Sequence, residues 1–474
     1  MHIFLFHRDL RLQDNTSLIH QIKKYGDVVP IFIFPPEQIN KNKNQYFSNN
    51  SVQFMIESLQ DLSQEISEKN GKLYFFEGDN LTVLKTLHKD NKIESIAFNI
   101  DYTPYAKKRD YEIQKWCEKN DIDCIHFEDY YLYNILDGET KKSDGKPYLV
   151  YTPFRNHCMN DLVVRKVDKS SRFKFDKVKN LEKNKYYLKS SDITKFYVDN
   201  PNINVHGGRK NALKILANIS KFKTYQKDRN TLTYKTTFLG AHLHFTTVSI
   251  REVYHKMVNK LGKKSGLINE LHWRDFYANI THEFPHILKG QIKGNNLSYK
   301  KDYDNIKWSY NKKLFSAWCT GTTGFPVVDA AMRQLNTIGY MHNRCRMIVA
   351  SFLTKDMHID WKDGEKYFAT KLVDYDPISN NGGWQWSAGS GTDAQPYFRI
   401  FNPWTQQENF DYDCKYIKYW LPELKNVPNK DIHKWYDKNI HKKWLASGVN
   451  YVEPVLDHDS ERKKTIDLYN KALK

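Results

Sequence analysis

Short apolar runs alternate with helical patterns along the first 130 residues, and this alternation restricts the possible folds more than any other feature of the chain. The runs that predict strands are Ile3–Phe6, Val28–Phe34, Leu73–Glu77, Ser95–Asn99 and Cys124–Phe127. Between them, Val52–Ile66 and Tyr105–Cys117 have the apolar spacing of helices. Because most of the runs are apolar on both faces, we expect an α/β domain over residues 1–130 with a doubly wound, five-stranded parallel sheet. No Gly-x-Gly-x-x-Gly follows the first strand, so the usual dinucleotide-binding fingerprint is missing.

The rest of the chain has a different character. At 474 residues two domains are expected. Residues 131–205 are polar and weakly periodic, which indicates an interdomain connection. Beyond them strand signals fade, and helical patterns cover Thr247–Leu261, Ile268–Thr281, Pro326–Ile338 and Asn343–Asp356. Residues 206–474 are therefore predicted to form a large all-α domain.

Composition limits the classes of function. The formal charge of +18 and the pI near 9.2 favour a polyanionic partner, although solvated lysines explain such a charge equally well. The six cysteines form no Cys-x-x-Cys pair and no zinc spacing, which favours a reduced, intracellular chain without structural metal. The apolar run at the N-terminus is too short for a signal peptide, and no stretch approaches the roughly 20 apolar residues of a membrane helix. We therefore expect a soluble protein of the cytoplasm, the nucleus or an organelle matrix.

The segment between Phe315 and Trp404 is crowded with tryptophan, asparagine and glycine. It contains Asp374-Tyr-Asp-Pro-Ile-Ser-Asn-Asn-Gly-Gly-Trp-Gln-Trp386, in which two Asn and two Gly make a poor helix interior by propensity. We interpret this segment as a place where backbone and planar side chains come close to a flat ligand.

A second motif follows the first predicted strand, at Phe6-His-Arg-Asp-Leu-Arg-Leu-Gln-Asp-Asn15. Alone, it reads as a charged strand-to-helix loop with Asp14 or Asn15 as an N-cap. Together with the tryptophan-rich segment, it resembles the photolyase/cryptochrome family over nearly the whole chain. The other matching motifs are Asp101-Tyr-Thr-Pro-Tyr105, Tyr225-Gln-Lys-Asp-Arg229, Thr236-Thr-Phe-Leu239, Glu270-Leu-His-Trp-Arg-Asp-Phe-Tyr277, Gly321-Thr-Thr-Gly-Phe-Pro-Val-Val-Asp-Ala-Ala-Met-Arg333 and Met341-His-Asn-Arg344.

The resemblance implies that the helical domain binds FAD. The residues it assigns to FAD are Tyr225, Thr236, Thr237, Phe238, Leu239, Gly240, Arg346, Asp374, Tyr375, Asp376 and Asn380. Among them, Arg346 pairs with Asp374, and the Asn380 amide faces flavin N5, where it can bond the ring in either protonation state. Two residues depart from the family pattern, since Gly240 stands where serine is usual and Thr246 where glycine is frequent.

Three tryptophans, Trp384, Trp361 and Trp308, match the family's electron-transfer chain from flavin to surface. A single buried Trp is more often core packing, but three at matching positions favour a redox chain.

The resemblance also implies a pocket for damaged DNA. Its residues are Arg229, Glu270, Trp273, Tyr277, Asn343, Arg344, Met347, Trp386 and Gln406. Trp273 and Trp386 are expected to stack on a pair of flipped-out bases, and Glu270 to bond or protonate the pyrimidines.

These assignments imply light-driven splitting of cyclobutane pyrimidine dimers by a monomeric enzyme. The alternative is a cryptochrome photoreceptor. Two features argue against it: Asn380 stands where plant cryptochromes resemble an Asp pattern and animal ones a Cys pattern, and only 68 residues follow Gln406 of the Asn402–Gln406 motif, which leaves no room for a long signalling tail. A third alternative is a light-independent nucleic-acid-binding module, which would need no flavin.

Members specific for (6-4) photoproducts resemble a two-histidine pattern at the positions of Asn343 and Met347. Folate-binding members resemble an Asn-Glu pair where this chain has Tyr105-Ala106, so a second, light-harvesting chromophore is of unknown identity or absent.

Overall fold

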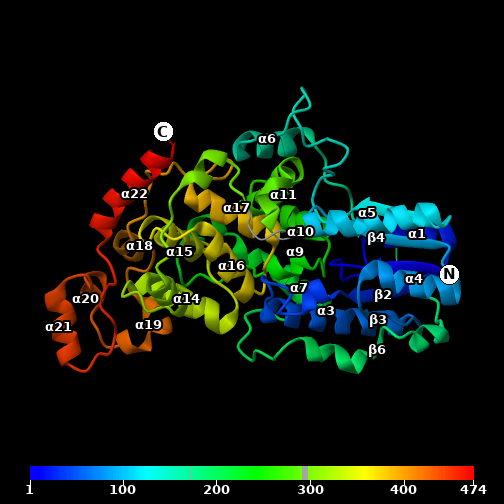
Figure 1. The fold of residues 1–474 in the computed structure, drawn as a ribbon, viewed down its shortest axis with the longest axis horizontal. Coiled ribbons are helices and arrows are strands. Elements are labelled where there is room, and N and C mark those ends of the chain that lie inside the picture. Colours follow the sequence, from blue (N-terminus) through cyan, green and yellow to red (C-terminus); the bar gives the residue numbers. More distant parts are fainter. Residues whose placement is uncertain (171, 291–296, 474) are drawn as a thin grey trace.

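The computed structural model describes residues 1–170, 172–290 and 297–473. An α/β domain and a larger helical domain lie side by side along the long axis of the molecule, at the right and left of Figure 1. The strands are β1 (His2–Phe6), β2 (Val29–Phe34), β3 (Tyr74–Glu77), β4 (Ser95–Ile100), β5 (Asp123–Glu128) and β6 (Tyr187–Leu188). The helices up to residue 161 are α1 (Thr16–Tyr25), α2 (Pro36–Ile39), α3 (Asn49–Glu68), α4 (Asn80–Asn91), α5 (Pro104–Lys119) and α6 (Tyr151–Asp161).

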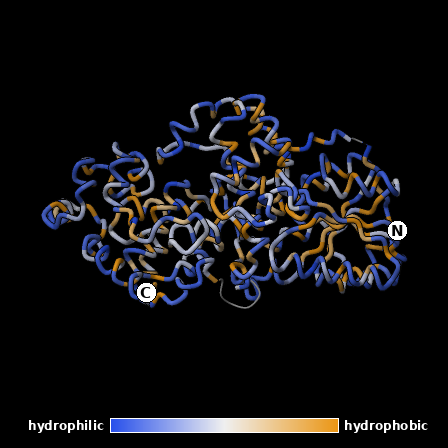
Figure 2. The backbone as a smooth tube through the Cα atoms, turned by 90° about the horizontal axis from the view of Figure 1, so that it is seen from above, coloured by the Kyte–Doolittle hydropathy of each residue, from blue (hydrophilic) through white to orange (hydrophobic). Residues whose placement is uncertain are grey.

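The sheet has the strand order β5-β4-β1-β2-β3-β6. Its first five strands are parallel, as predicted, but β6 adds a sixth strand, antiparallel to β3. The five-stranded prediction is wrong on this point because β6 is only two residues long and lies in the polar connection. Alternate residues of β1 enter two different cores, Phe4 and Phe6 on one face and Ile3 and Leu5 on the other. Figure 2 shows these apolar strands enclosed by more polar helices.

The helical domain is built from short helices. Those before residue 300 are α7 (Arg209–Ala217), α8 (Tyr225–Asp228), α9 (Gly240–His244), α10 (Ile250–Leu261) and α11 (Gly266–Glu283). Those after it are α13 (Lys312–Thr320), α14 (Pro326–Ile338), α15 (Asn343–Lys355), α16 (Trp361–Lys371), α17 (Pro377–Ala388), α18 (Pro403–Phe410), α19 (Lys415–Trp420), α20 (Asn429–His433), α21 (Lys438–Ala446) and α22 (His458–Leu473). Among the helices of the described ranges, none has the length and apolar character needed to cross a membrane.

The Arg8–Asn15 loop joins the two domains. Asn15 caps α1, as predicted, by accepting a hydrogen bond from the Leu18 amide. The charged residues of the loop are buried against the helical domain rather than solvated: Arg11 pairs with Asp129 at 2.5 Å, and Arg251 of α10 pairs with Asp14 at 2.6 Å. Removing one partner of such a buried pair leaves an uncompensated charge, which typically costs about 3–5 kcal/mol. The pairs that Arg251 makes with Asp14 and Asp129 therefore hold the two domains in one arrangement.

Thr246, which stands where relatives often have glycine, belongs to the same interface. Its backbone is left-handed (φ 33°), a conformation that is unfavourable for a β-branched residue. The Thr246 hydroxyl donates a hydrogen bond to the Arg8 carbonyl at 3.0 Å, and the Thr246 carbonyl accepts one from Arg11. The side chain thus contributes an interdomain contact that glycine cannot make.

The connection is anchored to the helical domain by Asp275 of α11, a fully buried carboxylate. It accepts hydrogen bonds from the backbone amides of Leu132 and Tyr133, at 2.9 and 3.4 Å. Burial raises the pKa of Asp275 to about 7, although Arg274 and these amides oppose the shift.

The raised pKa of Asp275 predicts a pH-dependent stability. The native state retains a proton that the unfolded chain releases near pH 4, so this group's contribution to stability is complete below about pH 4 and is lost as the pH rises to about 7. We expect Asp275→Asn, which keeps an oxygen acceptor, to remove this pH dependence. The free energy of unfolding should then change with pH by up to about 4 kcal/mol less than in the parent protein. Urea unfolding of both proteins between pH 4 and pH 8 measures it, and parallel profiles would contradict the assignment.

Candidate functional site

The loop before α9 and the segment before α17 meet at Asp374. Arg346 of α15 donates to both carboxylate oxygens of Asp374, at 3.1 and 2.9 Å, and to the Met341 carbonyl at 2.8 Å. A Cβ on Gly240 would lie 2.9 Å from an Asp374 oxygen, so the backbone approaches the carboxylate with no room for a side chain unless Asp374 shifts. This explains glycine at a position where the resemblance implies serine, and it leaves the Gly240 backbone without a side chain of its own beside a fixed acid.

The remaining loop residues predicted to bind FAD surround this contact. Thr237 and Leu239 are buried, and the Leu239 amide donates to the Thr237 hydroxyl at 3.4 Å. Phe238 has a left-handed backbone and packs edge-on against Tyr340. Thr236 is half-buried.

Asp376 begins α17 and is fixed on both oxygens. One oxygen caps the helix by accepting from the Ser379 amide at 2.8 Å, and the other lies 3.1 Å from Nδ1 of His244. Burial alone would raise the pKa of Asp376, but the hydrogen bond and charge of His244, with help from Arg274 and Arg8, hold it well below the usual range. Asp376 is therefore a permanent acceptor. Its neighbour Tyr375 is half-buried beside Tyr46 of the other domain.

Asn380 lies within α17, and the Asn-Asn-Gly-Gly stretch that it begins is helical. The propensity argument against a helix here is wrong, since Pro377–Ala388 forms one continuous helix between the Asp376 cap and Gly389. Tertiary packing overrides propensity, because a Cβ on Gly382 would lie 2.4 Å from the ring of Tyr277. At Gly382 the close approach is therefore made by a protein ring, whereas a Cβ on Gly383 would meet nothing within 4 Å. The Asn380 amide nitrogen donates to the Glu365 carbonyl at 3.0 Å, which fixes the direction of its oxygen.

The three predicted redox tryptophans occupy connected segments with graded burial. Trp384 and Trp361 are almost fully buried, whereas Trp308 is half-buried. A Cβ on Gly364 would lie 2.2 Å from the Trp384 indole, so this indole rests directly on α16, the helix that Trp361 begins. The Ser309 amide donates to the His358 carbonyl at 2.7 Å, which ties the Trp308 segment to the entrance of the same helix. Of the three, Trp308 alone is partly exposed, and the redox chain stays a prediction.

Glu270 is the centre of a charged cluster between α8 and α11. Its carboxylate pairs with Arg229 at 2.8 Å and hydrogen-bonds with the Tyr225 phenol. Partial burial raises the pKa of Glu270, while Arg229 and Tyr225 lower it. Tyr225, predicted to hold phosphate, thus contacts the acid predicted to meet the lesion.

The start of α15 presents the residues that were expected to determine which lesion fits. The Asn343 amide lies 3.8 Å from the Met347 sulfur, so the two share one face. Arg344 donates to Asn230 at 2.8 Å and lies over the Phe410 ring of α18. His342 precedes the helix as its N-cap, with Nδ1 accepting from the Arg344 amide at 3.1 Å.

Trp273 and Tyr277 follow Glu270 on α11 and form the aromatic part of the site. Trp273 is half-buried and lies 5.6 Å from Tyr277 between ring centroids. Trp386 of α17 and Gln406 of α18 are also half-buried. The predicted DNA-contacting residues therefore come from α8, α11, α15, α17 and α18, and contacts join α11 to α8 and α17, and α15 to α17 and α18.

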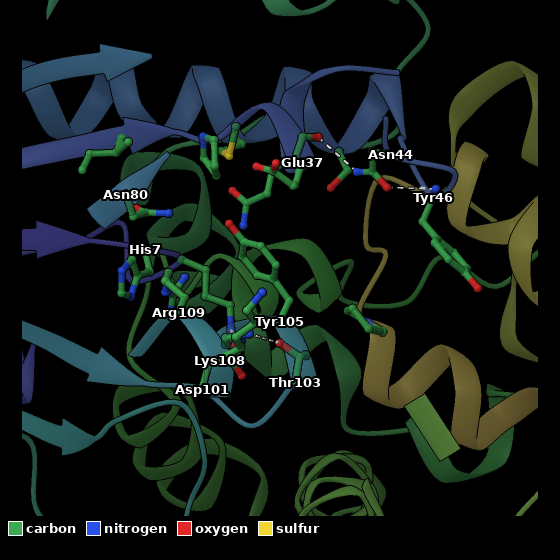
Figure 3. Close-up of a pocket in the computed structure, with 18 of the residues that line it drawn as sticks. His7, Glu37, Asn44, Tyr46, Asn80, Asp101, Thr103, Tyr105, Lys108 and Arg109 are labelled. Carbon is green, nitrogen blue, oxygen red and sulfur yellow. Dashed lines mark hydrogen bonds and ion pairs between the residues drawn. The ribbon is translucent and has the colours of Figure 1, made fainter. Parts of the chain in front are cut away.

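A cavity of about 610 Å³ lies where the carboxyl ends of the parallel strands face the helical domain, and Tyr375 and Asp376, both predicted to bind FAD, are among the residues that line it. Figure 3 shows side chains from the segments that follow β1 to β4 around it, among them His7, Glu37, Asp101, Tyr105 and Arg109. The volume falls within the range of cofactor pockets, roughly 300–1,000 Å³. Burial, Arg109 and Arg8 keep the pKa of His7 well below its usual range, so its neutral ring offers one donor and one acceptor.

Several residues of these sites escaped the sequence prediction. His244 fixes Asp376, Arg274 donates to the Leu243 and Tyr130 carbonyls, and Trp318 lies 6.0 Å from Trp384 between ring centroids. Tyr151 stacks on Trp273 from the supposed connection. His244 stands four residues after Gly240 and Arg274 directly after Trp273, which was the only signal that could have found them. Tyr151 and Trp318 have no local signal, because folding alone brings them to their partners.

Comparisons with known proteins agree with this geometry. Residues 2–171 match the family model described as DNA photolyase, and residues 267–471 match the FAD binding domain of DNA photolyase. The deoxyribodipyrimidine photo-lyase of Escherichia coli is 32% identical over 100% of this chain and 99% of its own length. An archaeal photolyase from Sulfolobus tokodaii with two FAD molecules is 36% identical, covers 99% of both chains and has a TM-score of 0.85. A cryptochrome from Synechocystis sp. PCC6803 shares the fold at 24% identity over 99% of both chains, with a TM-score of 0.84.

Proposed function

Since this chain belongs to the DNA photolyase family, we propose that it is a light-driven DNA-repair enzyme that splits cyclobutane pyrimidine dimers. The observation that carries the proposal is the adjacency of two residue sets, one suited to FAD and one to an extruded base pair. They meet on α15 and α17, where Arg346 and Asn380 belong to the first set and Met347 and Trp386 to the second.

The residues of the first set fit FAD. Asp374 is fixed by Arg346 beside the Gly240 backbone, and the Asn380 oxygen is oriented by the Glu365 carbonyl. When bound and reduced, FAD supplies the photoexcited electron that opens the cyclobutane ring. We assign Arg346 and Asp374 to anchoring the cofactor, Asp376 to accepting a hydrogen bond from it, and Asn380 to bonding its redox-active ring edge.

The second set performs recognition. Extruding a dimer costs a few kcal/mol, less at a lesion that already disrupts stacking, and stacking on aromatic rings returns about 1–3 kcal/mol per base. We assign the stacking to Trp273 and Trp386. Glu270 offers a carboxyl group to the pyrimidine edge, and Asn343 offers an amide to the carbonyls. Arg229, Arg344 and Gln406 are assigned to the DNA strand, where the net charge of +18 favours phosphate contacts.

Repair is tested with reduced protein and an oligonucleotide that contains one cyclobutane dimer. We expect the ultraviolet absorbance of thymine to recover under blue light and to remain unchanged in the dark. No recovery in the light would contradict the proposal. A photoreceptor role without repair is the cryptochrome alternative, and a colourless protein that still binds DNA would indicate the light-independent module.

We also infer that the cavity beside β1–β4 takes a second chromophore. Its size and mixed polar lining suit a planar cofactor, and the Sulfolobus relative carries two FAD molecules. Tyr105 and Ala106 line this cavity where folate-binding members have an Asn-Glu pair, so the carboxylate that would grip a pterin is missing.

The missing carboxylate predicts the cofactor content. We expect purified protein to release flavin, in excess of one per chain if the cavity is filled by flavin, and no stoichiometric folate. Chromatography of the heat-released cofactors against standards measures both. A stoichiometric methenyl-folate band would refute this prediction and leave the repair assignment intact.

We further propose that the enzyme acts as a monomer on UV-damaged DNA inside the cell. The DNA-contacting residues assigned above all come from one chain, so a single copy completes the site. Light scattering of the protein with and without a dimer-containing duplex tests this stoichiometry, and a dimeric protein would contradict it.

A further inference from the structure

Tyr151, the first residue of α6, lies flat against the indole of Trp273. Their ring centroids are 3.6 Å apart and their planes differ by 7°. Trp273 is the residue assigned to stacking on the lesion, whereas Tyr151 comes from a stretch that sequence reasoning treated as a connection. Figure 1 shows α6 covering one side of the helical domain above α11.

Tyr151 is itself held in place by the protein. Only 7% of it is exposed, and it packs edge-on against Phe276 of α11. Its phenol donates to the Asn269 carbonyl at 2.8 Å, and its backbone amide donates to an oxygen of Asp393 at 3.1 Å. The ring therefore has a fixed plane before any ligand arrives.

The contact fixes the plane of Trp273 as well. One face of the indole is covered by Tyr151, and its flanks meet Phe276 edge-on and Tyr277 at 34°. Because Trp273 is nonetheless only half-buried, part of the indole stays exposed. Ordinary core packing explains a buried tyrosine, but it does not require two rings to lie parallel with one of them partly open to solvent.

We propose that Tyr151 is a positioning residue, which holds the Trp273 indole in the plane that receives a base of the extruded lesion. The inference rests on the proposed function and adds a determinant of lesion specificity. A preset indole loses less conformational freedom when a base stacks on it, so the benefit falls on binding of the lesion and not on binding of intact duplex.

The test compares Tyr151→Met, which fills the volume without a flat face, with Tyr151→Phe, which keeps the ring and loses only the phenol hydrogen bond. Dissociation constants are measured for a duplex with one cyclobutane dimer and for the same duplex undamaged. Near-ultraviolet circular dichroism of the free protein reports the ordering of the indole, and thermal unfolding reports folding.

We expect Tyr151→Met to weaken dimer binding about tenfold, with undamaged DNA bound as before and a smaller tryptophan dichroism band. Tyr151→Phe should stay close to the parent protein in dimer binding, in binding of undamaged DNA and in the tryptophan dichroism band. In a Trp273→Leu background, Tyr151→Met should have no further effect on dimer binding, since the two residues act through one contact.

Two outcomes would overturn the inference: an unchanged preference of Tyr151→Met for the dimer, or an equal loss on both duplexes together with a lower unfolding temperature. If Tyr151→Met does not fold, Tyr151→Leu, which also lacks a flat face, replaces it in the same assays, and an unchanged preference again overturns the inference. A parent protein with no preference for the dimer would overturn the proposed function and this inference with it.

Discussion

Under blue light, a duplex that carries a cyclobutane dimer is expected to be repaired, while the same duplex with a (6-4) photoproduct is left unchanged. Repair of the second lesion moves a hydroxyl or amine between bases and needs a proton donor near neutral pH. Asn343 and Met347 stand at the positions where that donor is expected, and neither side chain exchanges a proton there. Loss of a general acid typically costs about 10²–10⁴-fold, so at least a 100-fold difference between lesions is expected.

His342 does not replace the missing acid. It precedes α15 as the N-cap. Its Nδ1 accepts from the Arg344 amide, and burial, with the charges of Arg344 and Arg346, lowers its pKa to about 4. The ring is therefore neutral at physiological pH. Both lesions should be assayed side by side with the reduced enzyme, and comparable turnover would mean that another residue donates the proton.

Trp384→Phe is expected to abolish photoreduction of oxidised FAD and to spare repair by chemically reduced protein. Trp384 is the tryptophan predicted to lie nearest the flavin, and benzene is much harder to oxidise than indole. Even a rise of about 1.4 kcal/mol in the barrier would slow the first electron transfer tenfold. Repair requires an electron to leave the flavin, so the tryptophans only replenish it. Absorption of the flavin during illumination with a mild reductant measures photoreduction, and thymine recovery measures repair.

Trp318→Phe is the matched control for this experiment. Trp318 is fully buried and contacts Trp384, but it is not among the three residues that lead towards the surface. Its replacement should leave photoreduction close to the parent rate, whereas Trp308→Phe should slow it. If Trp384→Phe photoreduces as fast as the parent, the redox chain is assigned wrongly.

The fold was predictable wherever a local pattern determines an element. The spacing of Pro326–Ile338 predicted α14 to the residue, because proline begins this helix and Gly339 ends it. The same reasoning failed for α17, where Tyr277 packing against Gly382 outweighs two asparagines and two glycines. It also missed β6, which is too short to leave a pattern.

The candidate site shows the same division. Motifs identified Arg346 and Asp374 as a pair, and the structure joins them. No motif marked His244 or Tyr151, because each acts through a residue more than 100 positions away in the chain. The role of the Arg8–Asn15 loop could likewise be predicted only in part from the sequence. Its helix cap is local, whereas its ion pair with Arg251 depends on how the two domains meet.

That interface sets a condition on light harvesting. Excitation energy passes between two chromophores at a rate that depends on their separation and on the angle between their transition dipoles. With Arg11, Asp14, Asp129 and Arg251 buried in mutual ion pairs, the segments of the α/β domain that line the cavity and the helical-domain residues assigned to FAD are held as one body. Donor and acceptor would therefore keep one relative orientation, and the brightness of the donor's fluorescence should be the same whether or not DNA is bound.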